Sequence, residues 1–376
     1  MVKIMTIFGT RPEGIKMVPV IQALDKESDI SNIVVNTAQH REMLDQVLDI
    51  FEIIPDYDLD IMQANQTLEE LTGRLINKIS FIIKQEQPDL VLVHGDTTTT
   101  TFAGAYSAYL NQIPVGHVEA GLRTYNILSP FPEEMNRQMV GRIATYHFAP
   151  TDTNRDNLLK ENIKKESIQV VGNTVIDVLL QISQRESYFS QELESLFNNG
   201  KKTILLTSHR RENLGTMKSV FRAVHRITTV NNDVQIVFPI HKNPKVREVA
   251  LDEIGDNQNI HLIEPLEYAQ FIQAMNRSYL IITDSGGIQE EAPGLGKPVL
   301  VTRDTTERPE GVAAGTLKLV GNSEELIFKE TQYLLDNKVA YNRMASTKNP
   351  FGQGDSAKQI VNYIKKIFLE EKAVLL

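Results

Sequence analysis

The stretch IFGTRPEGIK, from Ile7 to Lys16, joins the end of a predicted strand to the start of a predicted helix. The apolar-rich run Lys3–Phe8 ends at a glycine, and Pro12 suits the first turn of a helix, where a missing N–H is tolerated. The stretch also carries two cations, Arg11 and Lys16, near the beginning of that helix. It therefore predicts a strand, a tight turn and a helix, with a cationic turn suited to an anion.

The same alternation of strand and helix continues along almost the whole chain. Helical patterns such as HREMLDQVLDIF and LEELTGRLINKISFIIKQ have apolar residues three and four positions apart. The predicted strands are Lys3–Phe8, Asn32–Asn36, Leu90–His94, Pro114–Val118, Tyr146–Ala149, Gln169–Val171, Thr203–Thr207, Val234–Pro239, Ile260–Ile263, Leu280–Thr283, Val299–Val301 and Leu317–Val320. Such alternation predicts parallel sheets with helices on both faces.

The predicted strands form two series that separate near VVGNTVIDVLL. We therefore predict an α/β protein with two doubly wound, Rossmann-like domains that face a central cleft. The N-terminal domain is expected to cover residues 1–172 and the C-terminal domain residues 173–355. Residues 356–376 contain an amphipathic helix that is expected to pack on the body of the protein.

Composition narrows the class of protein. The 376 residues contain no cysteine, which excludes disulfides, thiolate zinc sites and cysteine nucleophiles. The net charge of −9 argues against broad binding to nucleic acid or to a membrane surface, although a local cationic cleft can still bind an anion. The sequence shows no signal peptide and no apolar run long enough to cross a bilayer. These features predict a soluble protein and are compatible with the cytoplasm.

The strongest anion-binding signal is TDSGGIQEEAPGLGKP, Thr283–Pro298. Ser285, Gly286 and Gly287 begin a helix directly after a strand, so free N–H groups and the helix dipole can bind a diphosphate. A carboxylate in the first turns, such as Glu291, could reach a ribose diol. A plain helix start is the alternative interpretation. The spacing matches neither the Walker pattern nor GxGxxG, so an ATPase and a nicotinamide enzyme are not favoured.

Acids follow other predicted strands. Asp96 and Glu119 each end a strand of the first series, where burial would raise their pKa unless cations such as Arg123 compensate. Glu133 and Glu134 follow Pro132 in the first turn of a helix, where the helix dipole is an alternative explanation. Together with Arg11, Lys16 and the segment SHRRENLG, these acids suggest proton transfer at a substrate that carries a diphosphate.

Two further motifs have simpler interpretations. The D-x-D pattern in DYDLD, Asp56–Asp60, is predicted to be a solvated turn rather than a metal site. The threonines of HGDTTTTTF are predicted to cap the following helix and to supply hydrogen bonds at the floor of the cleft. No local spacing of metal ligands is present in the sequence.

Seven segments in this order resemble the bacterial non-hydrolysing UDP-N-acetylglucosamine 2-epimerases: FGTRPEGIK, HGDTTTT, HVEAGLRT, SPFPEEMNR, TSHRREN, TDSGGIQEE and RDTTERPEG. The resemblance implies the GT-B fold, with the last helix crossing back to the first domain. It implies reversible conversion of UDP-N-acetylglucosamine to UDP-N-acetylmannosamine, without NAD or a metal, for surface polysaccharide or teichoic-acid linkage synthesis. It further implies a cytoplasmic homodimer that UDP-N-acetylglucosamine also activates.

The resemblance assigns roles to individual residues. The implied catalytic residues are Asp96, Glu119, Glu133 and His209. The implied substrate-binding residues are Arg11, Lys16, Phe271, Ser285, Gly286, Gly287, Glu291 and Arg308. The implied allosteric residues are Gln39, His40, Glu134, Arg137, Arg210 and His241. Which acid serves which face of the sugar stays open.

Three rival functions stay open beside the epimerase. A GT-B glycosyltransferase would share the fold and the UDP site but would transfer the sugar to an acceptor. A hydrolysing epimerase would release UDP and free N-acetylmannosamine. A nucleotide-sugar sensor would bind without turnover. The set of acids together with His209 favours epimerisation.

Overall fold

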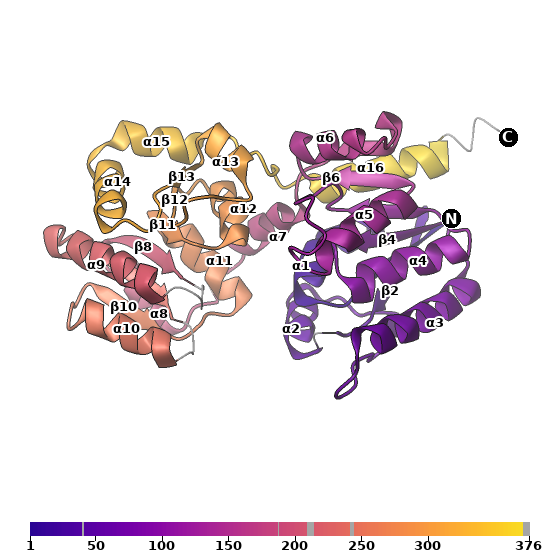
Figure 1. Ribbon diagram of the computed structural model, residues 1–376, viewed down its shortest axis with the longest axis horizontal. Coiled ribbons are helices and arrows are strands. Elements are labelled where there is room, and N and C mark those ends of the chain that lie inside the picture. Colours follow the sequence, from indigo (N-terminus) through magenta and orange to yellow (C-terminus); the bar gives the residue numbers. More distant parts are fainter. Residues whose placement is uncertain (40, 187, 209–213, 241–243, 371–376) are drawn as a thin grey trace. The chain divides into compact units, whose positions relative to one another are not determined.

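The computed structural model describes residues 1–39, 41–186, 188–208, 214–240 and 244–370 (Figure 1). They form two compact units. The first unit contains residues 1–178 and the chain from Gly354 on, and the second unit contains residues 179–353. The predicted boundary at residue 172 precedes helix α7 (Thr174–Ser183), whereas the structure divides within that helix. Asp177 accepts hydrogen bonds from the N–H groups of Ser356 and Ala357, at 3.3 and 3.0 Å, which keeps the start of α7 with the first unit.

The described residues of the first unit form a seven-stranded parallel sheet in the order β3-β2-β1-β4-β5-β6-β7. Its strands are β1 (Val2–Phe8), β2 (Ile30–Asn36), β3 (Tyr57–Asp58), β4 (Leu90–His94), β5 (Val115–Val118), β6 (Tyr146–Ala149) and β7 (Ile168–Val170). β1 lies inside the sheet, where it pairs with β2 and β4, and nearly all its residues are buried. The order places the carboxyl ends of β1, β4 and β5 side by side.

Strand β3 corrects the prediction that DYDLD is a solvated turn. Val35 and Asn36 of β2 pair with Tyr57 and Asp58 as a short edge strand. The Asp56 carboxylate accepts the Val34 N–H at 2.8 Å and therefore fixes the register. Polar residues can form a strand at the edge of a sheet, because an edge strand pairs on one side only and its side chains can remain in contact with solvent. The local composition did not indicate this pairing, since its partner strand precedes it by about twenty residues.

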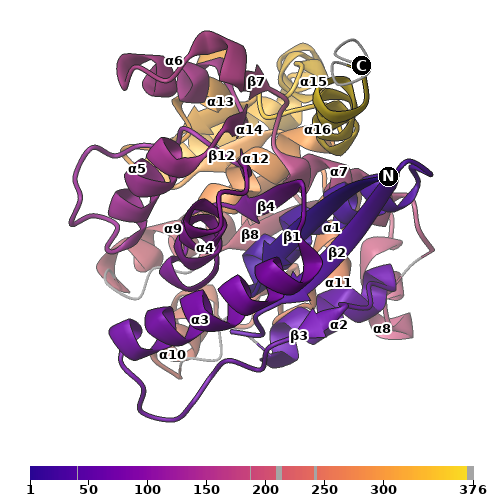
Figure 2. The ribbon, with the colours of Figure 1, turned by 90° about the vertical axis from the view of Figure 1, so that its right-hand side faces the viewer.

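Helices cover both faces of the first sheet (Figures 1 and 2). They are α1 (Arg11–Asp25), α2 (Arg41–Phe51), α3 (Leu68–Glu86), the π-helical turn η1 (Thr98–Phe102), α4 (Ala103–Leu110), α5 (Glu133–Ile143), α6 (Asp152–Lys160), the short 3-10 turn η2 (Lys165–Ser167), α7, α16 (Ser356–Lys365) and the π-helical turn η3 (Lys366–Glu370). α16 packs beside α1, and its Ile360, Val361 and Ile364 are buried in the same core as Ile4 and Phe8 of β1. The end of the described chain is therefore part of the first unit.

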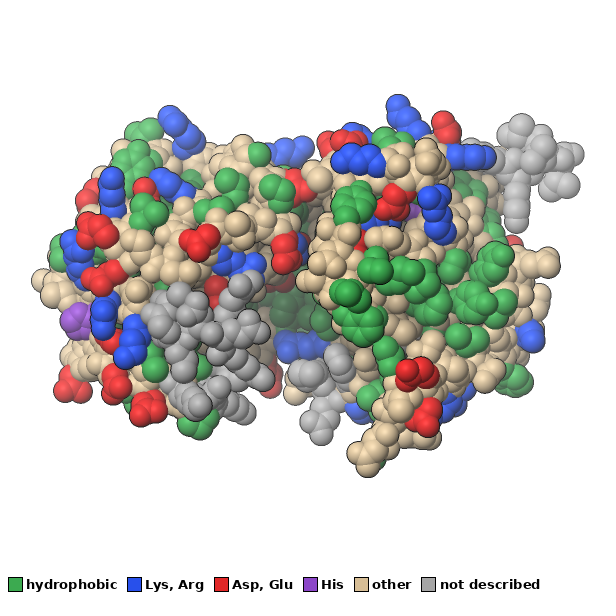
Figure 3. Space-filling view, in the orientation of Figure 1, with side chains coloured by type: hydrophobic (Ala, Val, Ile, Leu, Met, Phe, Trp, Pro, Cys, Tyr) green, Lys and Arg blue, Asp and Glu red, His purple; other side chains and the backbone are tan. Residues whose placement is uncertain are grey.

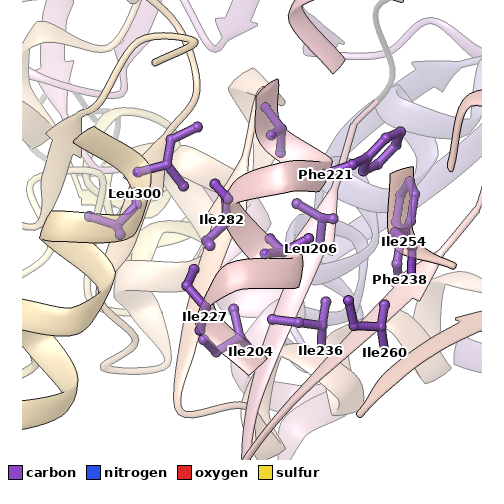
Figure 4. Close-up of a cluster of buried hydrophobic side chains, with 14 of the residues drawn as sticks. Ile204, Leu206, Phe221, Ile227, Ile236, Phe238, Ile254, Ile260, Ile282 and Leu300 are labelled. Carbon is purple, nitrogen blue, oxygen red and sulfur yellow. The ribbon is translucent and has the colours of Figure 1, made fainter. Parts of the chain in front are cut away.

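The described residues of the second unit form a six-stranded parallel sheet in the order β10-β9-β8-β11-β12-β13. Its strands are β8 (Lys202–Thr207), β9 (Val234–Pro239), β10 (Ile260–Ile263), β11 (Leu280–Thr283), β12 (Val299–Val301) and β13 (Leu317–Leu319). Its helices are α8 (Gln191–Phe197), α9 (Leu214–Val230), α10 (Pro244–Ile254), α11 (Tyr268–Arg277), α12 (Gly286–Gly294), α13 (Pro309–Ala314), α14 (Glu324–Asp336) and α15 (Lys338–Ser346). The core between α9 and the sheet packs Phe221 and Ile227 against Leu206, Ile236 and Phe238 (Figure 4).

The predicted fold class is confirmed: both sheets are parallel, doubly wound and covered by helices. All the predicted strands are present with end shifts of at most two residues, and β3 is added. The strands were predictable because both faces of a central parallel strand are buried, which requires runs of apolar residues. In the described part of the chain, no helix is long and apolar enough to cross a membrane.

Candidate active site

The turn between β1 and α1 is organised by Glu13. Thr10 and Glu13 form a capping box at the start of α1, and the Glu13 carboxylate accepts the N–H groups of Gly9 and Thr10 at 2.9 and 3.0 Å. The same carboxylate accepts hydrogen bonds from the hydroxyls of Thr97 and Thr101, at 2.5 and 3.3 Å. Glu13 is buried, and this burial raises its pKa against the opposing effect of the hydrogen bonds. It therefore ties the cationic turn to the turn that follows β4.

Replacing Glu13 by alanine is expected to lower the free energy of unfolding by about 3–5 kcal/mol, because it leaves buried donors of Gly9 and Thr10 without an acceptor. Chemical denaturation would measure the change. The matched control is Glu70→Ala, since Glu70 completes a similar capping box with Thr67 that is exposed to solvent. Its expected loss is about 1 kcal/mol or less. Equal losses in the two variants would contradict the structural role of Glu13.

Asp96 and Glu119 follow β4 and β5, which are neighbours in the first sheet. The ammonium group of Lys16 from α1 forms an ion pair with the Glu119 carboxylate. The other Glu119 oxygen lies 3.8 Å from Nε2 of His94, a buried residue at the end of β4. Burial lowers the pKa of His94 to about 4, so its ring is neutral at neutral pH. Glu119 therefore lies between one cation and one neutral imidazole.

Asp96 is bound by Arg137 of α5. Nε and Nη2 of Arg137 lie 2.9 and 2.7 Å from Oδ2 of Asp96. Burial raises the pKa of Asp96, Arg137 opposes this rise, and the charge of Glu119 adds to it. Arg137 thus balances the negative charge of Asp96, and Lys16 balances the negative charge of Glu119.

The prediction that Arg123 compensates these acids is wrong. The guanidinium of Arg123 is bound instead by Glu161, at 2.7 and 2.8 Å. Glu161 follows α6, which packs beside β6 and β7, and this pairing was not visible from local sequence. The Thr97 hydroxyl accepts the N–H of Thr101 at 3.4 Å at the start of η1, as a cap of the following helix requires. Thr97 and Thr101 also hydrogen-bond to Glu13, and Thr98 accepts a hydrogen bond from Asn136.

The other predicted residues of the first unit occupy different positions. Glu133 begins α5 and is partly exposed. Glu134 is fully buried beside Arg137, and Arg137 contacts Asp96, so two residues assigned by resemblance to an allosteric site are connected to Asp96. Arg11 is the first residue of α1, and Gln39 lies in the connection after β2. The predicted residues His40, His209, Arg210 and His241 lie outside the described residues.

In the second unit, the start of α12 has the features expected of an anion site. Ser285 precedes the helix without capping it through its side chain. The N–H of Ser285 is held by the Thr283 hydroxyl at 3.0 Å, and that hydroxyl is 2.6 Å from the hydroxyl of Thr207 on β8. A Cβ atom added at Gly287 would meet no atom within 4 Å. The first N–H groups of α12 are therefore available to an anion that approaches the backbone.

Arg308 and Glu290 form an ion pair next to the start of α12. Glu290 is buried in the first turns of that helix. Asn349 donates a hydrogen bond to the Glu290 carbonyl at 3.1 Å. Glu291 and Phe271 are both partly exposed, on α12 and α11 respectively. Within the described ranges, no group of three or more histidine, aspartate or glutamate residues could hold a metal ion.

Comparisons with known proteins identify the family of the chain. The family model described as UDP-N-acetylglucosamine 2-epimerase matches residues 22–365. The chain belongs to the UDP-N-acetylglucosamine 2-epimerase family. It is 55% identical to the UDP-N-acetylglucosamine 2-epimerase of Bacillus subtilis (strain 168), over 96% of this chain and 94% of that protein. The resemblance stated from the seven segments is confirmed, and the chain is an enzyme of this family.

Solved structures of epimerases have the same fold. The S. aureus MnaA-UDP co-structure superposes with a TM-score of 0.82 at 51% identity, covering 98% of this chain and 97% of that one. A UDP-GlcNAc 2-epimerase from Neisseria meningitidis, bound to UDP-GlcNAc, gives a TM-score of 0.83 at 47% identity, with coverages of 97% and 100%. These likenesses span both units of the epimerase described here, and they confirm the GT-B type of fold.

Sequence reasoning missed several residues of the candidate site. Glu13 could have been found from T-x-x-E, Thr10–Glu13, which is the signature of a capping box. Asn136 donates hydrogen bonds to the Asp96 carbonyl at 2.8 Å and to the Thr98 hydroxyl at 2.7 Å, and no local pattern indicates this. His94 precedes the glycine that follows β4. Its approach to Glu119 could not be predicted, because it depends on the pairing of β4 with β5.

Proposed function

We propose that this protein catalyses reversible epimerisation at C2 of UDP-N-acetylglucosamine, giving UDP-N-acetylmannosamine. The observation that carries the proposal is the pair of part-buried acids, Asp96 and Glu119, that follow neighbouring strands and are each bound by a cation. A relative at 47% identity has been solved with UDP-GlcNAc bound, which supports this choice of substrate. No cofactor or metal is part of the proposal.

The chemistry explains why both acids and an anion site are needed. The C2 hydrogen of an N-acetyl sugar has no neighbouring carbonyl to acidify it. Partial breakage of the anomeric C–O bond makes C1 oxocarbenium-like and acidifies C2. The electron pair of the C2–H bond then forms the C1=C2 bond, a carboxylate takes the proton, and UDP leaves with the electrons of the C–O bond. Return of UDP with a proton delivered to the opposite face of the 2-acetamidoglucal completes the inversion.

The first unit supplies the proton carriers in this proposal. Asp96, Glu119 and Glu133 are the candidates, and both faces of C2 must be served. Asp96 and Glu119 are held in place by Arg137 and Lys16, so little reorganisation is needed when the reaction begins. Arg11, at the start of α1, is proposed to contact the sugar or the diphosphate.

The second unit supplies the nucleotide site in this proposal. Ser285, Gly286 and Gly287 bind the diphosphate through backbone N–H groups, and Glu291 binds the ribose. Negative charge gathers on the departing diphosphate, so N–H groups that point at it lower the barrier most in the transition state. Phe271 is proposed to lie beside the uracil, Arg308 to line the site, and His209 to stabilise the leaving group.

A homodimer, an activating role for UDP-N-acetylglucosamine and a cytoplasmic location complete the proposal. Aromatic side chains at the end of η1 and on α4 support the dimer: Phe102, Tyr106 and Tyr109 stack with ring centroids 5.7 and 6.3 Å apart. Tyr109 is 60% exposed, and Phe81 on the adjacent α3 is 68% exposed. Hydrophobic side chains gather on the face that carries α4 (Figure 3). The allosteric set Gln39, His40, Glu134, Arg137, Arg210 and His241 remains a proposal.

One NMR experiment in deuterated water tests the function. The expected result is deuterium at C2 of intact UDP-sugar with both epimers present. Free N-acetylmannosamine with UDP would instead select a hydrolysing epimerase. Transfer of the sugar to an added acceptor would select a glycosyltransferase, and binding without exchange would select a sensor. Turnover of the UDP-sugar without solvent isotope at C2 would contradict the elimination.

A further inference from the structure

The first turn of α5 holds the turn that follows β4. The side-chain amide of Asn136 donates a hydrogen bond to the backbone carbonyl of Asp96, at 2.8 Å, and so fixes the backbone there. Arg137 holds the Asp96 side chain through Nε and Nη2, at 2.9 and 2.7 Å. Two neighbouring residues of one helix therefore fix both the backbone and the carboxylate of Asp96.

Arg137 is itself held from the other side by Glu134. Its Nη1 lies 3.2 Å from the Glu134 carboxylate. That carboxylate is fully buried and also accepts the N–H groups of Thr124 and Tyr125, at 2.9 and 3.1 Å, and the amide of Gln138, at 3.0 Å. A carboxylate with this many donors has a fixed position. Burial raises the pKa of Glu134, but the hydrogen bonds from Thr124, Gln138, Tyr125 and Arg137 together outweigh it and lower this pKa, so the carboxylate stays ionised.

Three charged groups face Asp96 from three different elements: Lys16 from α1, Glu119 after β5 and Arg137 from α5. Lys16 forms its ion pair with Glu119. Of these three groups, Arg137 is the one that contacts the Asp96 carboxylate directly. The negative charge of Glu119 and the burial of Asp96 both favour its neutral form, which cannot accept a proton.

We propose that Arg137, held in place by Glu134, is a positioning residue that keeps the Asp96 carboxylate ionised and oriented for proton transfer at C2. This inference rests on the proposed function. It differs from the allosteric role that the resemblance implies for Glu134 and Arg137, because it requires only contacts within the first unit.

The test measures Asp96 directly and then measures the reaction. Aspartate labelled with carbon-13 at the carboxyl group allows the titration of Asp96 to be followed by NMR without substrate, with Asp96→Asn identifying the signal. In Arg137→Met the titration is expected to move up by about 1–3 pH units, since a contacting cation is lost. Asp96 must be ionised in the direction of epimerisation in which it removes the C2 proton. In that direction the rate of C2 deuteration should fall about 10-fold at neutral pH and recover as pH rises.

The matched control is Arg142→Met, which removes an exposed arginine from the last turn of the same helix and should change neither measurement. Arg137→Lys keeps the positive charge but cannot contact Asp96 and Glu134 at the same time in the same way, so a smaller shift in the titration of Asp96 is expected. If Arg137→Met does not fold, Arg137→Lys takes its place in the test. Unchanged titration of Asp96 in both Arg137 variants would overturn the proposal, as would a shifted titration with an unshifted pH profile. A wild-type enzyme that exchanged no deuterium would contradict the proposed function instead, and the substrate-free titration would still decide the role of Arg137.

Discussion

Replacing Asp96 by asparagine is expected to slow deuterium exchange at C2 by about 1000-fold, because a positioned general acid–base group contributes on that order. Asparagine has nearly the same shape and still offers an oxygen to Arg137, so the turn after β4 should be preserved. It cannot accept or deliver the proton. The affinity for UDP, measured by calorimetry, should remain within about twofold of the wild type, since the proposed nucleotide site belongs to the second unit.

The control for this variant is Asp58→Asn. Asp58 is also a carboxylate bound by an arginine, Arg41 at 2.6 Å, but it lies on the edge strand β3. Its replacement should leave the exchange rate unchanged. Normal exchange in Asp96→Asn would remove Asp96 from the mechanism, whereas loss of both exchange and UDP affinity would indicate a general disturbance of the protein.

Replacing Gly287 by valine is expected to weaken UDP binding by about 100-fold, because a side chain there keeps the diphosphate from two N–H groups of α12. Each such hydrogen bond to a charged group contributes about 1.5–3 kcal/mol, and about 1.4 kcal/mol corresponds to tenfold in affinity. The fold itself does not require glycine at this position, since an added Cβ meets no atom within 4 Å. The midpoint of thermal unfolding without ligand should therefore be unchanged or slightly higher, because glycine is a poor helix former.

Gly73→Val provides the matched control. Gly73 lies in α3 of the first unit, and a Cβ added there also meets nothing within 4 Å. Both substitutions place valine in an open position of a helix, so they should affect stability alike. UDP affinity should fall in Gly287→Val alone. An unchanged UDP affinity in Gly287→Val would mean that the start of α12 does not bind the diphosphate.

Much of the architecture was predictable from local sequence. Runs such as Leu90–His94 and Leu280–Thr283 are apolar up to their last residue, as strands buried on both faces require. The start of α12 was also predictable, because Ser285, Gly286 and Gly287 follow a strand almost directly and glycine and serine are typical of a strand-to-helix turn. The edge strand β3 was not predictable, because only one of its sides pairs and its composition is that of a turn.

The sequence by itself determined the two parallel sheets, the order of the strand-end motifs and the presence of acids and cations after those strands. Tertiary structure alone decided which acid meets which cation. Lys16 reaches Glu119 across 103 positions of the chain, and Arg137 reaches Asp96 across 41. Arg123, which is much closer to Glu119 in sequence, binds Glu161 instead. The reason is the strand order: β4 lies between β1 and β5, so the turns that follow these three strands meet at one edge of the sheet, whatever their separation along the chain.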